Sequence, residues 1–300
     1  MCCEFLVYQP ALMGAAAETS LKLELSDVCN TALVTLHCRA LESQSADPML
    51  TDLRAEKLIH DLRPRLLESS LPLHRSLAAG KVEAAMQTYV ALRSRRFDRY
   101  AGEFLEEYPE GRVVNLGCGL DTRRWRLNSE RVIDVDLPPM ADLRIELLRA
   151  PVIACDVREH RWMDAVAERA DGPLLVLAEG LFMYLPEDEV RGLVEAMADK
   201  FPGCRMVAEV FNRFWLGSDR REQIESRLQT RLGFGSNARF VSGLSESAEL
   251  EKWDSRFRLL DEWSFVDENE PKLGRLRKLR HFPQFRKRQW VVCYSLGGRG

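Results

Sequence analysis

The first third of the chain shows a helical pattern of apolar positions. In residues 26–44, Leu33, Leu36 and Ala40 recur at the three- and four-residue spacing of one helix face. Ser26 or Asp27 is suited to cap the start of this helix, because a short polar side chain can accept a hydrogen bond from the first turn. The same pattern predicts two further helices, at residues 51–62 and 80–107.

From residue 112 the pattern changes to short apolar runs that alternate with amphipathic segments. This alternation is typical of a parallel sheet flanked by helices. The segment PEDEVRGLVEAMADKFPG is predicted as a helix, because Pro186 stands at its start, acids fill its first turn, and Pro202 and Gly203 end it. Seven strands are predicted, at residues 112–116, 131–135, 152–154, 174–178, 205–210, 258–265 and 289–296.

The segment between the fifth and sixth predicted strands is longer than a simple crossover needs. We expect it to supply an inserted helical lid at about residues 212–257, with four aromatic side chains as an apolar cover; ordinary core packing explains the same aromatics equally well. The chain then divides into residues 1–108, a leader and helical cap, and residues 109–300, an α/β sheet domain with the lid. The four aromatics are Phe214, Trp215, Phe234 and Phe240.

Composition narrows the class of protein. The 300 residues are 46% hydrophobic and 30% charged, and no apolar run approaches the roughly 18 to 20 residues that span a bilayer. Disordered, fibrous and membrane-spanning proteins are therefore not expected. Forty-three basic and 46 acidic side chains leave a net charge of -3, so there is no global basic field, and nucleic acid is an unlikely partner.

Eight cysteines are scattered along the chain without a C-x-x-C pair and without histidine at zinc-ligand spacing. We expect buried, reduced thiols, no metal site, and a cytoplasmic protein. The first 20 residues lack the basic start of a secretory signal and are interrupted by Glu4 and Pro10, so we expect a frayed leader, with Met13 as an alternative start.

A glycine-rich turn carries the first chemical indication. In RVVNLGCGLDT, Gly117 and Gly119 follow the first predicted strand, where a tight turn lets the backbone approach a ligand. A plain strand-to-loop turn is the alternative. Thr122 stands where the dinucleotide fingerprint G-x-G-x-x-G has its third glycine, and Asp121 lies beside it. This departure favours S-adenosylmethionine, which has no phosphate, over NAD as the cofactor.

An acidic residue about twenty positions further on supports a nucleoside site. Asp136 ends the second predicted strand in RVIDVDLPPM, where a carboxylate can accept hydrogen bonds from ribose hydroxyls. Asp134 is the alternative, because the two acids share one face of the strand. A helix-capping or salt-bridging role for either acid stays open.

Four motifs in order carry a family resemblance: VVNLGCGLDTRRWRL, IDVDLP, ACDVREH and LLVLAEGLFMYLPEDEV. Together they resemble the leucine carboxyl methyltransferase family, including its bacterial branch linked to O-methylation of polyketides. The N-terminal NTALVTLHCRALES and DPMLTDLRAEKLI are similar to the lead-in of that branch. The resemblance implies a class I, Rossmann-like methyltransferase fold. It is poor in the C-terminal third, which leaves the methyl acceptor open.

The resemblance also implies roles for individual residues. Arg93, in ALRSRRFD, matches the arginine that binds the cofactor carboxylate, and Asp156 matches the acid that accepts from the adenine amino group. Glu179 follows an apolar strand and would receive the cofactor's ammonium group; Tyr184 would line the methyl-transfer pocket. The alternatives are a solvated helix arginine for Arg93, a loop or N-cap acid for Asp156, a buried structural acid for Glu179 and a core aromatic for Tyr184.

Methyl transfer from a sulfonium is an in-line displacement, so the protein mainly aligns donor and acceptor and excludes water. A carboxylate acceptor needs no base, whereas a hydroxyl needs one. The histidines are expected to be surface residues rather than bases: His37, His60, His74, His160 and His281. This favours a small acidic acceptor or catalysis by proximity.

The leading hypothesis is thus an S-adenosylmethionine-dependent O-methyltransferase acting on a carboxylate or hydroxyl of a small molecule. A protein carboxyl methyltransferase and a non-catalytic cofactor-binding module are alternatives, and an NAD enzyme is the least favoured. The basic run KLGRLRKLRHFPQFRKR, residues 272–288, would attract an anionic substrate, a carrier protein or nucleic acid, or, as the favoured alternative, form a solvated loop that compensates the acids before it.

Overall fold

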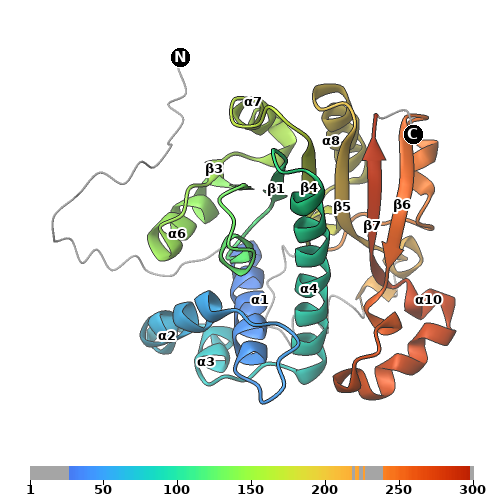
Figure 1. The fold of residues 1–300 in the computed structure, drawn as a ribbon. Helices are drawn as coiled ribbons and strands as arrows, with labels where there is room; N and C mark the ends of the chain where they lie inside the picture. The colour runs from blue at the N-terminus through green and yellow to red at the C-terminus, as the bar shows by residue number, and fades with distance from the viewer. Residues whose placement is uncertain (1–26, 218–219, 223–225, 227–238, 298–300) are drawn as a thin grey trace, which may run out of the picture.

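The computed structural model describes residues 27–217, 220–222, 226 and 239–297. Its centre is a seven-stranded sheet with the order β3-β2-β1-β4-β5-β7-β6 (Figure 1). The strands lie within about two residues of every predicted range. They are β1 (Arg112–Leu116), β2 (Val132–Asp136), β3 (Ile153–Ala154), β4 (Leu174–Ala178), β5 (Cys204–Phe211), β6 (Phe257–Trp263) and β7 (Gln289–Leu296).

One strand breaks the parallel pattern of the sheet. β1 to β5 pair in parallel, but β7 inserts between β5 and β6 and is antiparallel to both. Two parallel neighbours need a connection that crosses from one end of the sheet to the other. The antiparallel strands β6 and β7 are instead connected at the same end of the sheet, through the basic segment. The predicted seven-stranded, mostly parallel α/β sheet is confirmed.

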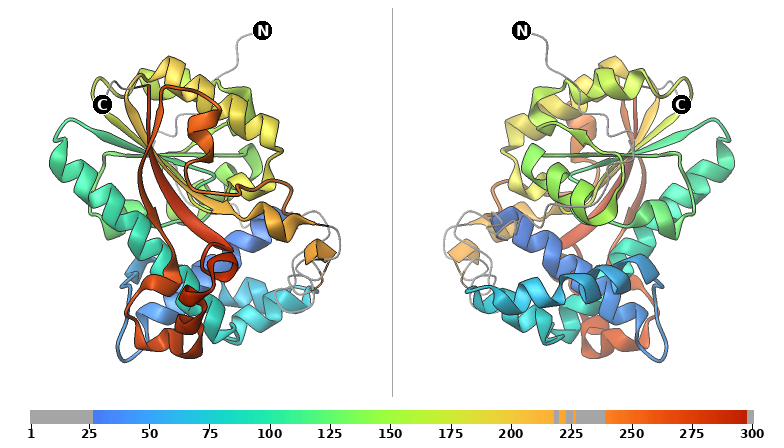
Figure 2. Two further views of the ribbon diagram at one scale, coloured as in Figure 1. Left: turned by 90° about the vertical axis from the view of Figure 1, so that its right-hand side faces the viewer. Right: turned by 90° about the vertical axis from the view of Figure 1, so that its left-hand side faces the viewer.

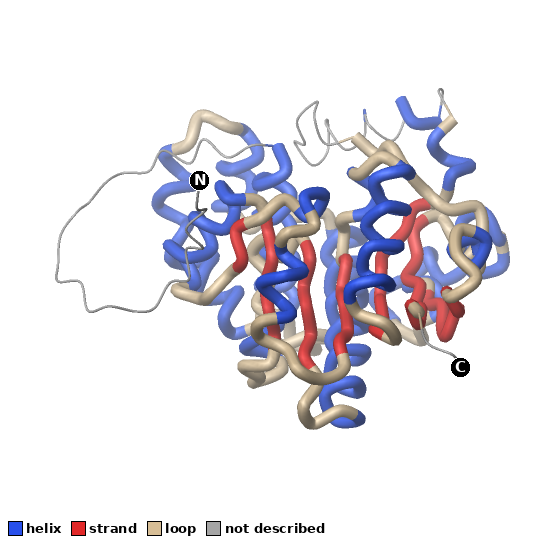
Figure 3. The backbone as a smooth tube through the Cα atoms, turned by 90° about the horizontal axis from the view of Figure 1, so that it is seen from above, coloured by secondary structure: helices blue, strands red, loops and turns tan. Residues whose placement is uncertain are grey.

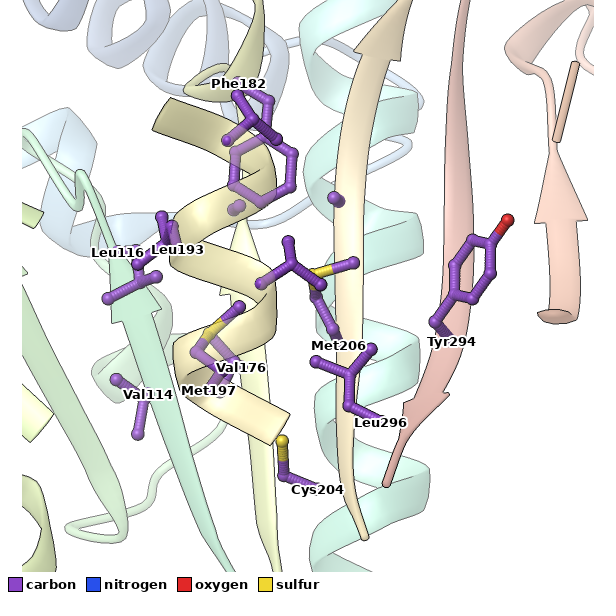
Figure 4. Close-up of a cluster of buried hydrophobic side chains, with 14 of the residues drawn as sticks. Val114, Leu116, Val176, Phe182, Leu193, Met197, Cys204, Met206, Tyr294 and Leu296 are labelled. Carbon is purple, nitrogen blue, oxygen red and sulfur yellow. The ribbon is translucent and has the colours of Figure 1, made fainter. Parts of the chain in front are cut away.

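Helices cover both faces of the sheet (Figures 1 and 3). Side chains of α7 and α8 pack on one face with Val114, Val176 and Met206, and Figure 4 shows Leu193 and Met197 of α8 against these strand residues. α4 packs on the other face through Phe97 and Phe104. The α-helices are α1 (Asp27–Ser43), α2 (Leu53–Glu68), α3 (Pro72–Ala78), α4 (Ala84–Glu107), α5 (Arg123–Arg126), α6 (Pro138–Leu148), α7 (Trp162–Ala167), α8 (Glu187–Lys200) and α10 (Pro283–Arg286).

α1, α2 and α3 form a helical cap beside one end of the sheet (Figure 2). Buried leucines of α1 and α2, such as Leu36 and Leu62, make a second core with residues of α6. Asp52 ties this cap to the sheet. Its carboxylate caps α2 by accepting from the Ala55 backbone N–H at 2.9 Å, and it pairs with Arg39 and Arg126 at 3.0 Å each.

Two predicted helices have different ends in the structure. α2 continues past Pro64 to Glu68, although proline removes one hydrogen bond of the helix, because Leu62 and Leu66 on either side of it are buried in the cap core. α4 begins at Ala84 rather than at residue 80, since Gly80 has a left-handed φ of 67°. The basic segment is not a simple loop: it forms the 3₁₀ helix η6 (Pro271–His281) followed by α10.

The histidine expectation is wrong for two residues. His37 and His74 are buried inside the cap, where His37 contacts the Leu33 carbonyl oxygen through Nδ1 at 2.8 Å, and His74 contacts Asn30 through Nε2 at 2.9 Å. Burial lowers the pKa of both imidazoles. Apolar helix faces bury whatever lies on them, and these two histidines lie on such faces.

The predicted lid lies only partly within the described residues. Its described portion holds the 3₁₀ helices η3 (Arg213–Leu216) and η4 (Glu249–Lys252), and a β-bridge joins Asn212 to Leu244. Phe234, Met13, Cys2 and Cys3 lie outside the described residues. Across the ranges that the structure describes, no helix combines the length and the apolar character that crossing a bilayer requires.

Candidate active site

A cavity of about 470 Å³ lies where β1, β2 and β4 end. Open α/β sheets bind ligands at this carboxyl edge, because the loops there diverge and expose backbone donors. Residues of α1 and α4 form its other walls. All eight residues singled out in the sequence line this cavity: Arg93, Gly117, Gly119, Asp121, Asp136, Asp156, Glu179 and Tyr184. Their individual roles stay predictions.

The glycine turn has the backbone geometry that its sequence indicates. Gly117 and Gly119 have φ angles of 61° and 47°, in the left-handed region that favours glycine. A Cβ at Gly117 would lie 3.1 Å from Leu181 Cδ1, and one at Gly119 would lie 3.1 Å from the Cβ of Ala32 on α1. The cap therefore covers the turn closely, and larger residues at either position would push into the cavity wall.

Asp134 and Asp136 occupy different surroundings. The Asp134 carboxylate pairs with Arg144 at 2.7 Å and accepts from Asn115 Nδ2 at 3.1 Å, with both ion-pair side chains 1% exposed. Asp136 lines the cavity and accepts one backbone N–H on each oxygen, from Gly119 at 2.6 Å and Leu137 at 2.7 Å. Burial raises its pKa against these two hydrogen bonds. Of the two acids, Asp136 is the one placed to meet a ligand.

Arg93 and Glu179 form a charged pair in the cavity wall. Arg93 Nε donates to Glu179 Oε1 at 2.8 Å, and Arg123 Nη2 donates to Glu179 Oε2 at 2.5 Å. Burial opposes ionisation of Glu179, but the two arginines more than offset it, and the pKa of this carboxyl is lowered. The wall therefore presents a cation and an anion side by side. This pair is complementary in charge to the carboxylate and the ammonium group of an amino acid.

Asp121 is fully engaged by the chain itself. One oxygen accepts from the Arg123 backbone N–H and Arg126 Nη2, and the other accepts from Asn115 Nδ2 and Arg123 Nη1, at 2.7 to 3.2 Å. Burial disfavours its charge, yet Arg123 and Arg126 hold the pKa of Asp121 well below its usual range. The carboxylate therefore orients two arginines behind the turn.

Asp156 follows β3 and is partly exposed at the rim. Its strongest partner is Arg158, whose side chain donates to both carboxylate oxygens and lowers the pKa of Asp156. The side chain of Arg158 is 51% exposed, so this pair is open to solvent and can exchange partners at little cost.

Two site residues were missed in the sequence. Arg123 is 1% exposed and joins Asp98, Asp121 and Glu179. Glu209 on β5 is fully buried and pairs with Arg93 at 2.9 Å. A charged residue inside the otherwise apolar run MVAEVF is the signal that would have found Glu209.

The part of the cavity wall that carries Arg93, Glu179 and Asp121 is called the charged end, and the neighbouring part that carries Tyr184 and Phe240 is called the aromatic end. Tyr184 meets Phe240 edge to face with ring centroids 5.3 Å apart, and Phe240 packs on Phe211 at 4.8 Å. Arg288, which precedes β7, and Gln289, which begins it, also line this cavity. Burial raises the pKa of Tyr184 to about 12. This end therefore offers apolar walls with a few polar groups.

Of the three lid aromatics that the structure describes, one lines the cavity. Phe240 lines the cavity, whereas Phe214 and Trp215 are absent from its lining; Phe214 is half exposed, and Trp215 packs on Phe285. Among the residues that the structure describes, no group of three or more His, Cys, Asp or Glu could hold a metal ion.

Comparison with known proteins supplies the class of enzyme. The family model described as Leucine carboxyl methyltransferase matches residues 32–198, more than half of the 300 residues. The chain belongs to the leucine carboxyl methyltransferase family. As a member of it, the protein is a methyltransferase, and the matched region contains every one of the eight cavity residues named above.

Two relatives extend the similarity beyond the matched region. The chain is 28% identical over 288 residues to the tetracenomycin polyketide synthesis O-methyltransferase of Streptomyces glaucescens, covering 91% of this chain and 98% of that protein. It is 27% identical over 202 residues to an S-adenosyl-L-methionine-dependent methyltransferase of Gibberella zeae, covering 63% of this chain and 66% of that protein.

The fold also recurs among solved structures. A DUF574 family protein from Streptomyces avermitilis superposes with a TM-score of 0.52 at 10% identity, covering 88% of this chain and 96% of that one. A protein from Thermobifida fusca superposes with a TM-score of 0.51 at 18% identity, covering 94% of this chain and all of that one. At these identities the similarity concerns the fold alone.

Proposed function

We propose that this methyltransferase transfers a methyl group from S-adenosylmethionine to a carboxylate or hydroxyl oxygen of a small molecule. The observation that carries the proposal is one cavity with a charged end and an aromatic end. The charged end suits the cofactor and the aromatic end suits an acceptor. The relative from Streptomyces glaucescens, named as a polyketide O-methyltransferase, supports oxygen as the acceptor atom.

S-adenosylmethionine is the cofactor, and the residues present fit it. The cavity volume of about 470 Å³ lies within the roughly 300–1,000 Å³ of typical ligand sites. Each oxygen of Asp136 accepts one backbone hydrogen bond, which leaves a lone pair on each for a ribose hydroxyl. When bound, this cofactor supplies an electrophilic methyl group on a sulfonium.

We assign the remaining roles from the surroundings of each side chain. Glu179 receives the cofactor's ammonium group and Arg93 its carboxylate, because these two side chains already lie side by side. Asp156 accepts from the adenine amino group in exchange for part of its pairing with the exposed Arg158. Gly117 and Gly119 leave room for the cofactor, and Asp121 supports the turn through its arginine partners.

At the aromatic end, Tyr184 and Phe240 shape the space in which the acceptor meets the methyl group. Tyr184 stays protonated at neutral pH, because burial raises its pKa to about 12, so it acts as a wall and a hydrogen-bond donor. Arg288 gives this end a positive charge suited to an anionic acceptor. A carboxylate held there is already ionised and needs no base.

We also propose the division of the chain into a cap of residues 1–108 and a sheet domain of residues 109–300, with the site between them. Arg93 and the α1 wall come from the first part, and the other predicted cofactor residues come from the second. A cytoplasmic location is supported by Cys38, Cys118, Cys155, Cys204 and Cys293, which are buried free thiols.

A labelled methyl-donor assay tests the proposal. The protein is incubated with methyl-labelled S-adenosylmethionine and an extract of its native host, and the small-molecule and protein fractions are separated. Label in a small molecule is expected, and mild base distinguishes a methyl ester, which it cleaves, from an ether. Label confined to the protein fraction would instead identify a protein carboxyl methyltransferase. Cofactor binding without any transfer would identify a binding module.

A further inference from the structure

Glu209 is a buried carboxylate whose role is not explained by the cofactor contacts assigned above. It lies in β5 with no solvent exposure, and its neighbours in the strand, Ala208 and Val210, are also buried. A buried carboxylate is costly unless hydrogen bonds and an opposite charge compensate it. Its partners therefore decide in which protonation state it is stable.

Only one of the hydrogen bonds to Glu209 comes from a charged group among the described residues. Oε1 accepts from the Tyr89 hydroxyl and from Gln289 Nε2 at 2.8 Å, and Oε2 accepts from Arg93 Nη1 at 2.9 Å. The Gly180 backbone N–H also donates to the carboxylate. Burial raises the pKa of Glu209 to about 8 in spite of the hydrogen bonds from Gln289 and Gly180.

The titratable and charged groups around Glu209 come from four neighbouring elements. Three further groups lie near Glu209 in addition to its hydrogen-bond partners. Glu179 pairs with the same arginine, Arg93, and burial raises the pKa of Tyr184 while the charge of Arg93 acts to lower it. Arg288 lines the same cavity. By element they are Tyr89 and Arg93 on α4, Glu179 at the end of β4, Tyr184 on the 3₁₀ helix η2 (Phe182–Tyr184), and Arg288 next to β7.

Glu179 and Glu209 compete unequally for Arg93. Glu179 has a second cation, because Arg123 Nη2 donates to its other oxygen at 2.5 Å. Glu209 has Arg93 as its cation partner among the described residues. A third carboxylate on Arg93 would therefore leave Glu179 compensated by Arg123, while Glu209 would lose much of its compensation in a buried place. Of the two carboxyl groups, Glu209 is the one that would take up a proton.

We propose that Glu209 is a positioning residue for Arg93 that takes up one proton when the cofactor's carboxylate binds to this arginine. The inference rests on the proposed role of Arg93 in the cofactor site. The proton comes from solvent and no other bond is made or broken. In the ionised form Glu209 keeps the guanidinium oriented, and in the protonated form it releases Arg93 to the cofactor and can donate its own O–H.

The sign of the pH dependence follows from this coupling. Cofactor binding favours the protonated form of Glu209, so affinity is greatest below the pKa of this group and falls as pH rises through it. Above that pKa, affinity for a carboxylate-bearing cofactor is expected to fall by up to about tenfold per pH unit. A ligand with the same nucleoside but without the amino-acid tail should not show this dependence.

Calorimetry of the full chain tests the proposal. S-adenosylhomocysteine is titrated at several pH values between about pH 6.5 and about pH 9, in pairs of buffers with different ionisation enthalpies, which gives the number of protons taken up on binding. The α-amino group of the free ligand also titrates in this range and gains a proton when it is bound as an ammonium, so its share is subtracted with the help of the ligand's own titration curve. We expect a remaining uptake that approaches one proton at the alkaline end. The matched ligand is 5′-methylthioadenosine, which keeps the adenosine and lacks the carboxylate and ammonium, and it should bind without uptake.

The Glu209→Gln variant assigns the proton. Glutamine keeps the shape of the side chain and removes its charge, so the uptake that remains after the ligand's own amine is subtracted should disappear, and S-adenosylhomocysteine should bind about tenfold more tightly than to the parent protein near pH 9. Equal uptake in parent and variant, or none with the parent protein, would overturn the inference. Failure of S-adenosylhomocysteine to bind at all would instead overturn the proposed function. If the variant does not fold, the deaminated analogue of S-adenosylhomocysteine, which keeps the carboxylate and lacks the amine, decides on the parent protein: uptake should persist with it, and its absence would overturn the inference.

Discussion

The two ends of the cavity are built in different ways. The charged end is held by buried ion pairs between residues far apart in the sequence, such as Arg123 with Glu179 and Arg126 with Asp52. The aromatic end is held by ring packing among Tyr184, Phe211 and Phe240. Ion pairs and bidentate hydrogen bonds fix direction as well as distance, whereas apolar packing tolerates changes of shape.

This difference in construction suggests which end of the cavity can vary in shape between related enzymes and which end cannot. In the proposed function, the charged end holds a cofactor of fixed structure, and the aromatic end holds an acceptor that differs between enzymes. The wall at the aromatic end is made from η2, the end of β5, Phe240 and residues at the start of β7. Three of these segments lie beyond residue 198, where the family model stops matching. The predictions below test whether the two ends respond independently.

The largest effect is expected from breaking an ion pair behind the charged end. Asp134→Ala leaves Arg144 buried without its carboxylate, which should lower the free energy of unfolding by about 3–5 kcal/mol. Urea denaturation measures the change. Glu130→Ala is the matched control, because the Glu130 side chain is 90% exposed in its pair with Arg124 and should matter by less than about 1 kcal/mol. Similar losses in both variants would show that the buried pairs do not hold this end.

The next effect concerns cofactor affinity. Asp136→Ala should weaken binding of S-adenosylhomocysteine by about 100-fold or more. The variant loses the two hydrogen bonds that we propose between the ribose hydroxyls and the Asp136 carboxylate, and the backbone hydrogen bonds that orient this carboxylate. Calorimetry measures the affinity, and thermal unfolding checks that the variant is folded. Unchanged affinity would show that Asp136 does not bind the ribose. It would also contradict the preference for Asp136 over Asp134 as the residue that meets the ligand.

At the aromatic end, a smaller and more selective change is expected. Phe240→Ala should raise KM for the acceptor by about tenfold through lost apolar contact, while the dissociation constant of the cofactor stays within about twofold. Steady-state kinetics and calorimetry on one preparation give both values. Phe214→Ala is the control, because Phe214 is half exposed and absent from the cavity lining. A loss of cofactor affinity in Phe240→Ala as large as its rise in KM for the acceptor would show that the two ends do not respond independently.

The smallest effect is expected in the pH profile of Tyr184→Phe. The parent hydroxyl stays protonated well above neutral pH, because burial raises its pKa to about 12. Removing it should therefore leave the shape of the kcat profile unchanged between about pH 6 and about pH 9, with kcat lowered only several-fold. A limb of the profile that vanishes in the variant would make Tyr184 a proton-transferring residue instead of a wall.

The sequence predicts the skeleton of the fold because the relevant signals are local. Buried parallel strands appear as apolar runs, and a glycine turn with positive φ angles leaves two glycines at fixed spacing. The residues proposed to bind the cofactor at the ends of strands, such as Asp136 and Glu179, are found by the same reasoning. Their arrival at one cavity is then a consequence of parallel strands sharing one carboxyl edge.

The parts that escaped prediction depend on partners distant in the sequence. The burial of Arg123 could not be predicted from the sequence, because the three carboxylates that pair with it lie on α4, in the glycine turn and after β4. The pairing of Glu209 with Arg93 joins residues 116 positions apart. The cavity lining of the acceptor end was equally hidden, because Phe214 and Phe240 look alike in the sequence but only Phe240 turns inward.

Asp52 has a consequence for how the protein opens. Its single carboxylate joins the start of α2, Arg39 of α1, Thr122 of the glycine turn and Arg126 of α5. The N-terminal helices therefore cannot detach without breaking hydrogen bonds to the glycine turn that lines the cavity, and the helices and the turn should unfold as one cooperative unit. Ligand occupancy should then slow amide exchange in α1 and α2, although most of their residues lie outside the cavity wall.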